Sequence, residues 1–222
     1  MLLEKRQIYN FSLVALGDFN PKIIQPFWLA NKGLIGEKEA EDANIELIHS
    51  ELVKYSLTWV DIQIQQNRFE LKSSQEPYFE SIRDLFIGIF SKLQETPMKS
   101  FGINHIMHFS ARDEQEMFNI GNNLAPLNNW DMLNNPRVLN LEIVENKRSD
   151  GFDGKIRVKI QPSDLLIGSN MGFSISINDH YSFQEKNQTT DNVLKLISSQ
   201  WKSSFNSAQE IINKLEEKLF RL

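Results

Sequence analysis

Charged side chains alternate with apolar ones on both sides of a polar turn at residues 66–67. Asp61 lies before the turn, and Glu70 and Lys72 lie after it. If the loop has two residues, these three side chains share one face of a β-hairpin. A large class of metal-dependent nucleases uses this layout, in which two carboxylates hold Mg²⁺ and a lysine helps to position the attacking water. The spacing also fits a solvated sheet face with cross-strand ion pairs, and we favour this second interpretation.

A second candidate site consists of basic side chains that alternate along one predicted strand. Lys155, Arg157 and Lys159 are separated by single residues, so they share one face of that strand. They are the best candidates in the sequence for binding an anion. The alternative is an ordinary solvent-exposed sheet face opposite Glu142.

The remaining motifs do not predict a metal or cofactor site. His105 and His108 are three residues apart in a predicted strand and therefore point to opposite faces, which disfavours a shared metal. The chain has no cysteine, which excludes disulfides, thiolate ligands and a cysteine nucleophile. Ser169 lies one position away from the serine of a nucleophile-elbow motif, and the segment 168–172 predicts a plain turn. We expect neither a metal nor a cofactor.

Composition and charge narrow the class of protein and of partner. Hydrophobic residues make up 41% of the chain and charged residues 24%, which is ordinary for a soluble globular protein. The net charge of -5 disfavours a nucleic-acid partner, because Lys and Arg drive phosphate binding. The N-terminus lacks the apolar segment of a signal peptide, and the apolar runs are too short to cross a membrane. We therefore expect a cytoplasmic protein with no membrane partner.

Apolar periodicity in the first half predicts the elements that hold the hairpin. Period-two alternation predicts strands at residues 8–19, 45–55 and 98–109. It also predicts the first strand of the hairpin at residues 60–65, and the second strand follows the turn. A helix is expected to begin at Pro21, to contain Pro26 and to end near Gly33. A longer amphipathic helix begins at Pro77 and must lie on a sheet. The charged segment 37–42 is expected to be a solvated loop.

The second half of the chain contains fewer strands and a long final helix. Asp113 is expected to cap a short helix, and the segment 121–137 to be a long irregular crossover with Trp130 tucked beneath it. Residues 138–144 and 155–160 predict a second hairpin, and residues 173–177 the last strand. Apolar residues at steps of three and four from 190 to about 220 predict one helix of roughly 45 Å. That helix either packs across its own sheet, which we favour, or pairs with a partner helix.

Strands and helices in this order predict an α+β fold with largely antiparallel sheets. We expect two sheet-and-helix lobes that divide near residue 111. Residues 1–111 form a strand-helix-strands-helix-strand lobe, and residues 112–222 contribute a helix, three strands and the long C-terminal helix. One continuous domain is the alternative.

The middle and the end of the chain carry a set of loose motifs: Gln63-x-Gln65, Arg68-Phe69, Tyr78-Phe79, Phe86, Phe90, Gly102-Ile103-Asn104, Asn178-Asp179, Trp201 and Phe205. In these motifs, roughly residues 58–215 of the chain resemble a family of uncharacterised, sporadically distributed bacterial proteins of about 250 residues. Trp201 stands where members often have histidine, and the N-terminal segment has no counterpart. The resemblance implies a bacterial origin and an association with defence or mobile elements, but no reaction.

Three functions compete at this point. The leading hypothesis is a non-enzymatic protein-interaction or accessory protein that binds a protein partner, or forms a homo-oligomer, through its sheet face or final helix. The second is a binder of a small apolar ligand between the long helix and the sheet. The third is a metal-dependent nuclease that uses Asp61, Glu70 and Lys72.

Overall fold

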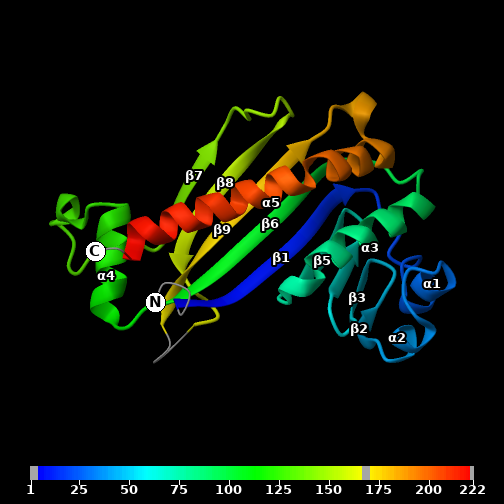
Figure 1. The fold of residues 1–222 in the computed structure, drawn as a ribbon, viewed down its shortest axis with the longest axis horizontal. Helices are drawn as coiled ribbons and strands as arrows, with labels where there is room; N and C mark the ends of the chain where they lie inside the picture. Colours follow the sequence, from blue (N-terminus) through cyan, green and yellow to red (C-terminus); the bar gives the residue numbers. More distant parts are fainter. Residues whose placement is uncertain (1–4, 167–170, 221–222) are drawn as a thin grey trace.

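The strands in the described part of the chain all belong to one nine-stranded antiparallel sheet (Figure 1). The computed structural model describes residues 5–166 and 171–220. The strand order is β2-β3-β4-β5-β1-β6-β9-β8-β7, so β6 lies between the first strand of the chain and the last. The strands are β1 (Arg6–Gly17), β2 (Asn44–Ile48), β3 (Leu52–Ser56), β4 (Asp61–Gln65), β5 (Arg68–Ser73), β6 (Met98–Ser110), β7 (Leu141–Glu145), β8 (Gly154–Pro162) and β9 (Gly172–Ser182).

The two principal helices lie on one face of this sheet (Figure 1). The helix α3 packs on β5 and β1, and α5 packs on β6 and β9. The α-helices are α1 (Pro26–Asn31), α2 (Glu37–Glu41), α3 (Phe79–Lys92), α4 (Glu114–Leu124) and α5 (Thr190–Phe220). Short 3₁₀ turns occur at Glu76–Tyr78, Leu127–Trp130 and Glu185–Asn187. We call the sheet face opposite to α3 and α5 the open face.

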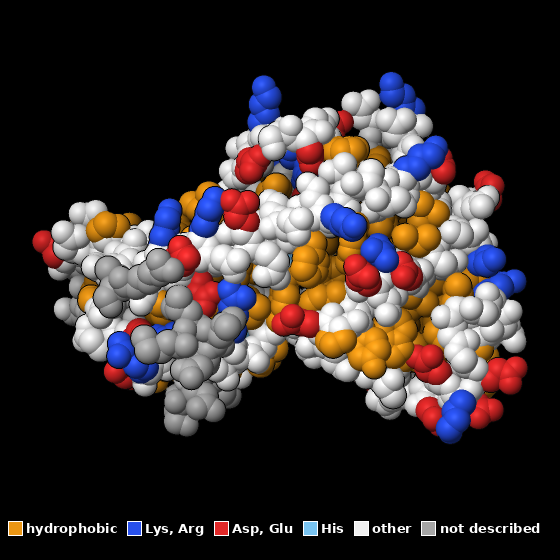
Figure 2. All heavy atoms as spheres, viewed as in Figure 1, with side chains coloured by type: hydrophobic (Ala, Val, Ile, Leu, Met, Phe, Trp, Pro, Cys, Tyr) orange, Lys and Arg blue, Asp and Glu red, His pale blue; other side chains and the backbone are white. Residues whose placement is uncertain are grey.

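The hydrophobic core lies between the sheet and these two helices. Alternate residues of the central strands point into it, including Phe11 and Leu13 of β1 and Ile103 of β6. From α5, the indole of Trp201 meets the ring of Phe11 edge-on, with centroids 5.5 Å apart. The apolar stripe of α5 is therefore used by its own sheet, as the sequence predicted. Figure 2 views this helix-covered face and shows apolar side chains in the seam between α3 and α5.

The expectation of two sheet-and-helix lobes is wrong. β6, from the first half of the chain, pairs with β1 on one side and with β9, from the second half, on the other. Both ladders run nearly the full length of the strands, so the sheet continues across the predicted boundary near residue 111. The α+β class, the antiparallel pairing and the long C-terminal helix are confirmed.

Three expectations for the N-terminal half need correction. The first helix begins at Pro26 rather than at Pro21, because a proline fits the first position of a helix better than its interior. The segment 37–42 contains the short helix α2 instead of a loop. The predicted strand 45–55 is a hairpin, β2 and β3, joined through His49 and residues 50–51.

In the second half of the chain, helices and strands occur in the predicted order, but several begin or end at other residues than predicted. Asp113 caps α4 by accepting a hydrogen bond of 2.8 Å from the backbone N–H of Glu116. Trp130 is 52% exposed and is therefore not tucked under the crossover. β7 begins at Leu141 rather than at residue 138, and β9 extends to Ser182. The serine of the segment 168–172 lies outside the described residues.

The described helices include none whose length and hydrophobicity together would suit a membrane span.

Packing between α3 and the sheet should dominate stability. Phe86 is fully buried, and its ring lies 5.2 Å from that of Phe101 and 4.6 Å from that of Phe90. We expect Phe86→Ala to lower the free energy of unfolding by about 3–5 kcal/mol in urea titrations, because it leaves a cavity in a packed core. Phe27, which is 60% exposed, is the matched control, and Phe27→Ala should change stability by less than about 0.5 kcal/mol. Equal effects would contradict this description of the core.

Candidate functional site

The open face of the sheet carries small and polar side chains at its centre. In β9 the odd-numbered residues from Phe173 to Tyr181 are buried under the helices. Their even-numbered neighbours Ser176, Asn178 and His180 therefore point to the open face. The same alternation places Ser12 of β1 and Asn104 of β6 beside them, since directly opposed residues of antiparallel strands share a face.

These residues line a groove of about 400 Å³ that crosses five strands. Its lining includes Ser12, Arg68, Glu70, Gly102, Asn104, Arg157, Ser176, Asn178 and His180. We call it the open-face groove. Four interstrand spacings give it a width of about 19 Å between β5 and β8. Ser12 is only 9% exposed although neither α3 nor α5 covers it, which shows that the middle of this face is recessed.

The floor of the groove is held by a ladder of side-chain hydrogen bonds. The amide of Asn178 donates to Asn104 Oδ1, and the amide of Asn104 donates to Ser12 Oγ at 3.2 Å. Gly102 keeps the floor low next to this ladder. A Cβ at Gly102 would lie 3.3 Å from Asn178 Nδ2, although its backbone has no positive φ that would demand glycine. Glycine inside a strand often marks a close approach by another chain or a ligand.

The predicted anion candidates lie on the open face, and one of them, Arg157, lines the groove. Lys155 is paired in register with His180, Arg157 with Asn178, and Lys159 with Ser176, so all three cations point to the open face. We call Lys155, Arg157 and Lys159 the cation row. Within the described residues, no carboxylate lies within ion-pair distance of the cation row. Even Glu142, which is opposite Lys159 in the register, forms no ion pair with it. By contrast, Arg68 across the groove pairs with Glu70 at 3.0 Å.

His180 lies on the open face beside Lys155, and its pKa is lowered mainly by burial. Desolvation by burial lowers its pKa below 6.5, and the charges of Arg157 and Arg148 lower it further. The carboxylate of Asp179 acts in the opposite direction, and Lys155 adds to the lowering. The ring is therefore neutral at pH 7, and its Nε2 lies 3.2 Å from Ser182 Oγ.

A buried ion-pair network fixes the connector between β7 and β8 and so positions the cation row. The guanidinium of Arg148 donates to Asp179 and to Asp150, and it lies 3.9 Å from the ring centroid of Tyr181. Asp179 also accepts a hydrogen bond of 2.9 Å from the hydroxyl of Tyr181 and one from Ser204 of α5. The network joins the connector, β9 and α5, so the start of β8 cannot shift without breaking buried charge-assisted hydrogen bonds.

The hairpin residues share a face as predicted, but their partners are not those of a metal site. Asp61 is opposite Lys72 in the register, and Gln63 is opposite Glu70. Asp61 accepts a hydrogen bond of 2.7 Å from Ser56 Oγ, and Glu70 is engaged by Arg68. No group of three His, Cys, Asp or Glu residues arranged to hold a metal ion occurs among residues 5–166 and 171–220.

The histidines of β6 point to opposite faces, as the sequence predicted. His105 lies under α5, where its Nδ1 is 2.7 Å from the hydroxyl of Tyr9. Burial lowers the pKa of His105 to about 3, so this ring is neutral and belongs to the core. His108 lies on the other face, where its Nδ1 is 2.8 Å from Ser163 Oγ.

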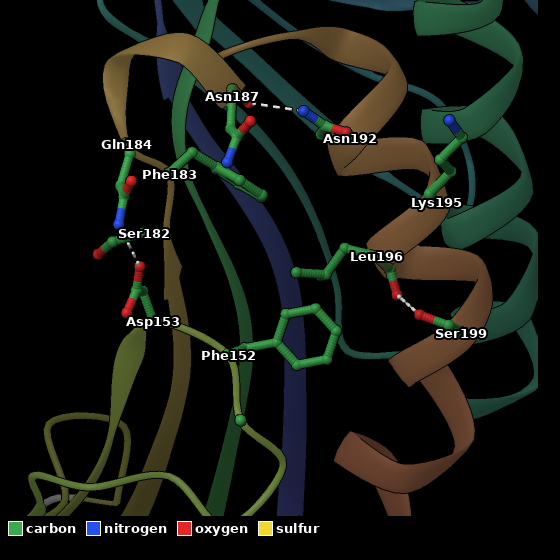
Figure 3. Close-up of a pocket in the computed structure, with 11 residues that line it drawn as sticks. Phe152, Asp153, Ser182, Phe183, Gln184, Asn187, Asn192, Lys195, Leu196 and Ser199 are labelled. Atoms are coloured by element: carbon green, nitrogen blue, oxygen red, sulfur yellow. Dashed lines mark hydrogen bonds between the residues drawn. The ribbon is translucent and has the colours of Figure 1, made fainter.

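A separate cavity of about 490 Å³ lies between the first turns of α5 and one end of the sheet (Figure 3). Phe152 from the β7–β8 connector and Leu196 from α5 point toward each other across it (Figure 3). Its rim is polar and includes Asn187, Asn192 and Ser199. This volume lies in the range of small-molecule sites.

Sequence reasoning missed the groove floor and the buried network. Ser12, Asn104 and Asn178 have no charge, and strands with polar residues at alternate positions are normally solvated on that side. The available signal was the length of the alternation, since β6 and β9 each keep polar residues on one face for several steps. Arg148 and Asp179 are separated in sequence, and nothing in the local pattern predicts that they pair.

Comparisons with known proteins add no assignment. No family model matches the chain, and no curated protein matches it. The resemblance to the sporadically distributed bacterial family therefore stays a prediction.

The Arg148 network makes stability depend on pH. Hydrogen bonds from Arg148 hold the pKa of the Asp150 carboxyl below its ordinary value of 3.8, and the backbone N–H of Phe152 adds to this. The stabilisation is therefore complete above the unfolded-state pKa and is lost as the pH falls through the lower folded-state pKa. In urea titrations below about pH 4, Asp150→Asn should reduce the dependence of the unfolding free energy on pH.

Asp153→Asn is the control for this titration, because the carboxyl of Asp153 lies outside the Arg148 network and accepts instead from Gln184 at 3.4 Å. If both variants keep the wild-type slope, the carboxylate of Asp150 does not support the folded state through Arg148.

Proposed function

We propose that this protein acts by binding a protein partner in the open-face groove, as a non-enzymatic accessory protein. The observation that carries the proposal is the recessed polar floor of Ser12, Asn104 and Asn178 at the centre of the sheet. A surface that is hydrogen-bonded internally and walled by cations is suited to recognition, because its side chains are already oriented before a partner arrives. The groove crosses five strands, which is wide enough to receive a polypeptide segment.

Other surfaces support the proposal less well. The final helix, which was the alternative contact surface, uses its apolar stripe to cover β6 and β9. A nuclease based on Asp61, Glu70 and Lys72 stays a prediction, and the pairing of Glu70 with Arg68 argues against it, because a carboxylate engaged by a cation is a poorer ligand for Mg²⁺.

Filling the groove should weaken partner capture. Gly102→Leu places a side chain on the floor, where the nearest atom to the new Cβ is Asn178 Nδ2 at 3.3 Å. We expect wild-type protein, used as bait in extract of its native host, to capture one partner that Gly102→Leu binds at least about tenfold more weakly when affinity is measured with the purified partner. Circular dichroism confirms that the variant is folded.

Gly36→Leu is the matched control, since a Cβ at Gly36 meets nothing within 4 Å and its φ of -73° suits any residue. This variant should retain the partner. Identical capture by all three proteins, or no capture by the wild type, would contradict the proposal. The partner can also be a second copy of this chain. Light scattering after size-exclusion chromatography tests this form, because a dimer that pairs through the groove would be lost in Gly102→Leu.

The cavity of Figure 3 favours one second candidate function, the binding of a small and partly apolar ligand between α5 and the sheet. Phe152 and Leu196 supply apolar walls, and the polar rim would orient such a ligand.

Replacing a serine at the rim tests this second function. Ser199→Trp should fill the cavity, and Ser198→Trp, at the next exposed position of α5 outside the lining, is its control. We expect 1-anilinonaphthalene-8-sulfonate to bind the wild type and Ser198→Trp with enhanced fluorescence, and Ser199→Trp to lose that enhancement. Equal fluorescence from the two variants would exclude the cavity as the binding site.

A further inference from the structure

We infer that the open-face groove recognises an extended polypeptide segment with acidic side chains at alternate positions, which pair with Lys155, Arg157 and Lys159. The inference rests on the proposed function of the groove and adds the chemistry of the partner. It assigns the cation row as the determinant of specificity and β9 as the floor beneath the bound segment.

The spacing of the cation row matches such a segment. Alternate residues of a strand lie about 6.7 Å apart, so Lys155 and Lys159 are about 13 Å from each other along β8. An extended segment has the same repeat, and its acidic side chains at every second position meet one cation each. A helical segment does not, because its side chains return to one face only every three or four residues.

The chemistry around the row fits carboxylates. The three cations have no ion-pair partner in the described part of the chain, so binding replaces water rather than an existing ion pair. Arg157 lies between Lys155 and Lys159, and its guanidinium can hold a carboxylate with two parallel hydrogen bonds. In register with Arg157, Asn178 belongs to the side-chain ladder of the floor, beside which the backbone of the segment would lie.

A polypeptide fits better than a nucleic acid. Affinity for nucleic acid grows with the number of phosphates that are neutralised, and the row supplies three cations on a protein of net charge -5. Proteins that bind single strands also stack bases on aromatic side chains. The described groove lining contains His180 but no Phe, Tyr or Trp.

Two labelled peptides of equal composition test the spacing. One contains three Glu-Ser repeats, and the other contains three Glu followed by three Ser. In fluorescence anisotropy at low salt, the full-length protein should bind the alternating peptide at least about threefold more tightly, because the second peptide cannot reach all three cations at once. A single-stranded DNA hexanucleotide and inorganic triphosphate serve as competing anions.

Charge reversal locates the site. We expect Arg157→Glu to weaken binding of the alternating peptide by about tenfold. Lys202→Glu makes the same change of charge at an exposed position of α5 and should bind like the wild type. His180 supplies an independent readout, since a carboxylate bound next to Arg157 should raise the pKa of its ring in an NMR titration.

Four results would overturn the inference. They are equal binding of the two peptides, preference for the oligonucleotide or triphosphate, equal effects of Arg157→Glu and Lys202→Glu, and absence of peptide binding. The experiment with the host partner separates this inference from the function on which it rests. Loss of capture in Gly102→Leu but not in Arg157→Glu would leave the groove as a binding site and remove the acidic segment. Retention in both would remove the function itself.

Discussion

The pairing of β6 with both β1 and β9 is the interaction on which the rest of the structure depends. It joins the two halves of the chain into one sheet and fixes the register at its centre. Because a shift of one residue would exchange the two faces of a strand, this register decides which side chains meet α3 and α5 and which reach the open face. The centre of the core and the floor of the groove are therefore opposite sides of the same three strands, β1, β6 and β9.

The two faces are stabilised by different means. On the helix-covered face, aromatic side chains such as Phe86 and Trp201 bury large apolar areas. On the open face, recessed polar groups would destabilise the fold if they lacked partners, and the ladder from Asn178 to Ser12 supplies them. The Arg148 network extends this stabilisation to the edge of the sheet by tying the β7–β8 connector to Asp179 and Ser204. The cation row, in which Lys155 and Arg157 are exposed and Lys159 is half-buried, thus lies on a strand whose start is held by this network.

Sequence patterns correctly predicted the elements whose structure depends on residues that are close together in the chain. The hairpin of β4 and β5, the cap at Asp113 and the limits of α5 all follow from neighbouring residues, and the structure confirms them. The single sheet could not be predicted in this way, because the pairing of β6 with β9 joins strands from the two halves of the chain. The same holds for the groove. Lys155, Arg157 and Lys159 were identified from their alternation, whereas Asn104 and Asn178 acquire meaning only when three strands bring them side by side.

The central claim is that the open face, and not the helix-covered face, meets the partner. Site-specific photocrosslinking in the native host tests it most directly. The photoreactive residue p-benzoylphenylalanine replaces Leu16, which is exposed at the edge of the groove, or Phe27, which is exposed in α1. The account predicts a covalent adduct with one host protein from position 16 and none from position 27. An adduct from position 27 alone, or none from position 16, would contradict it.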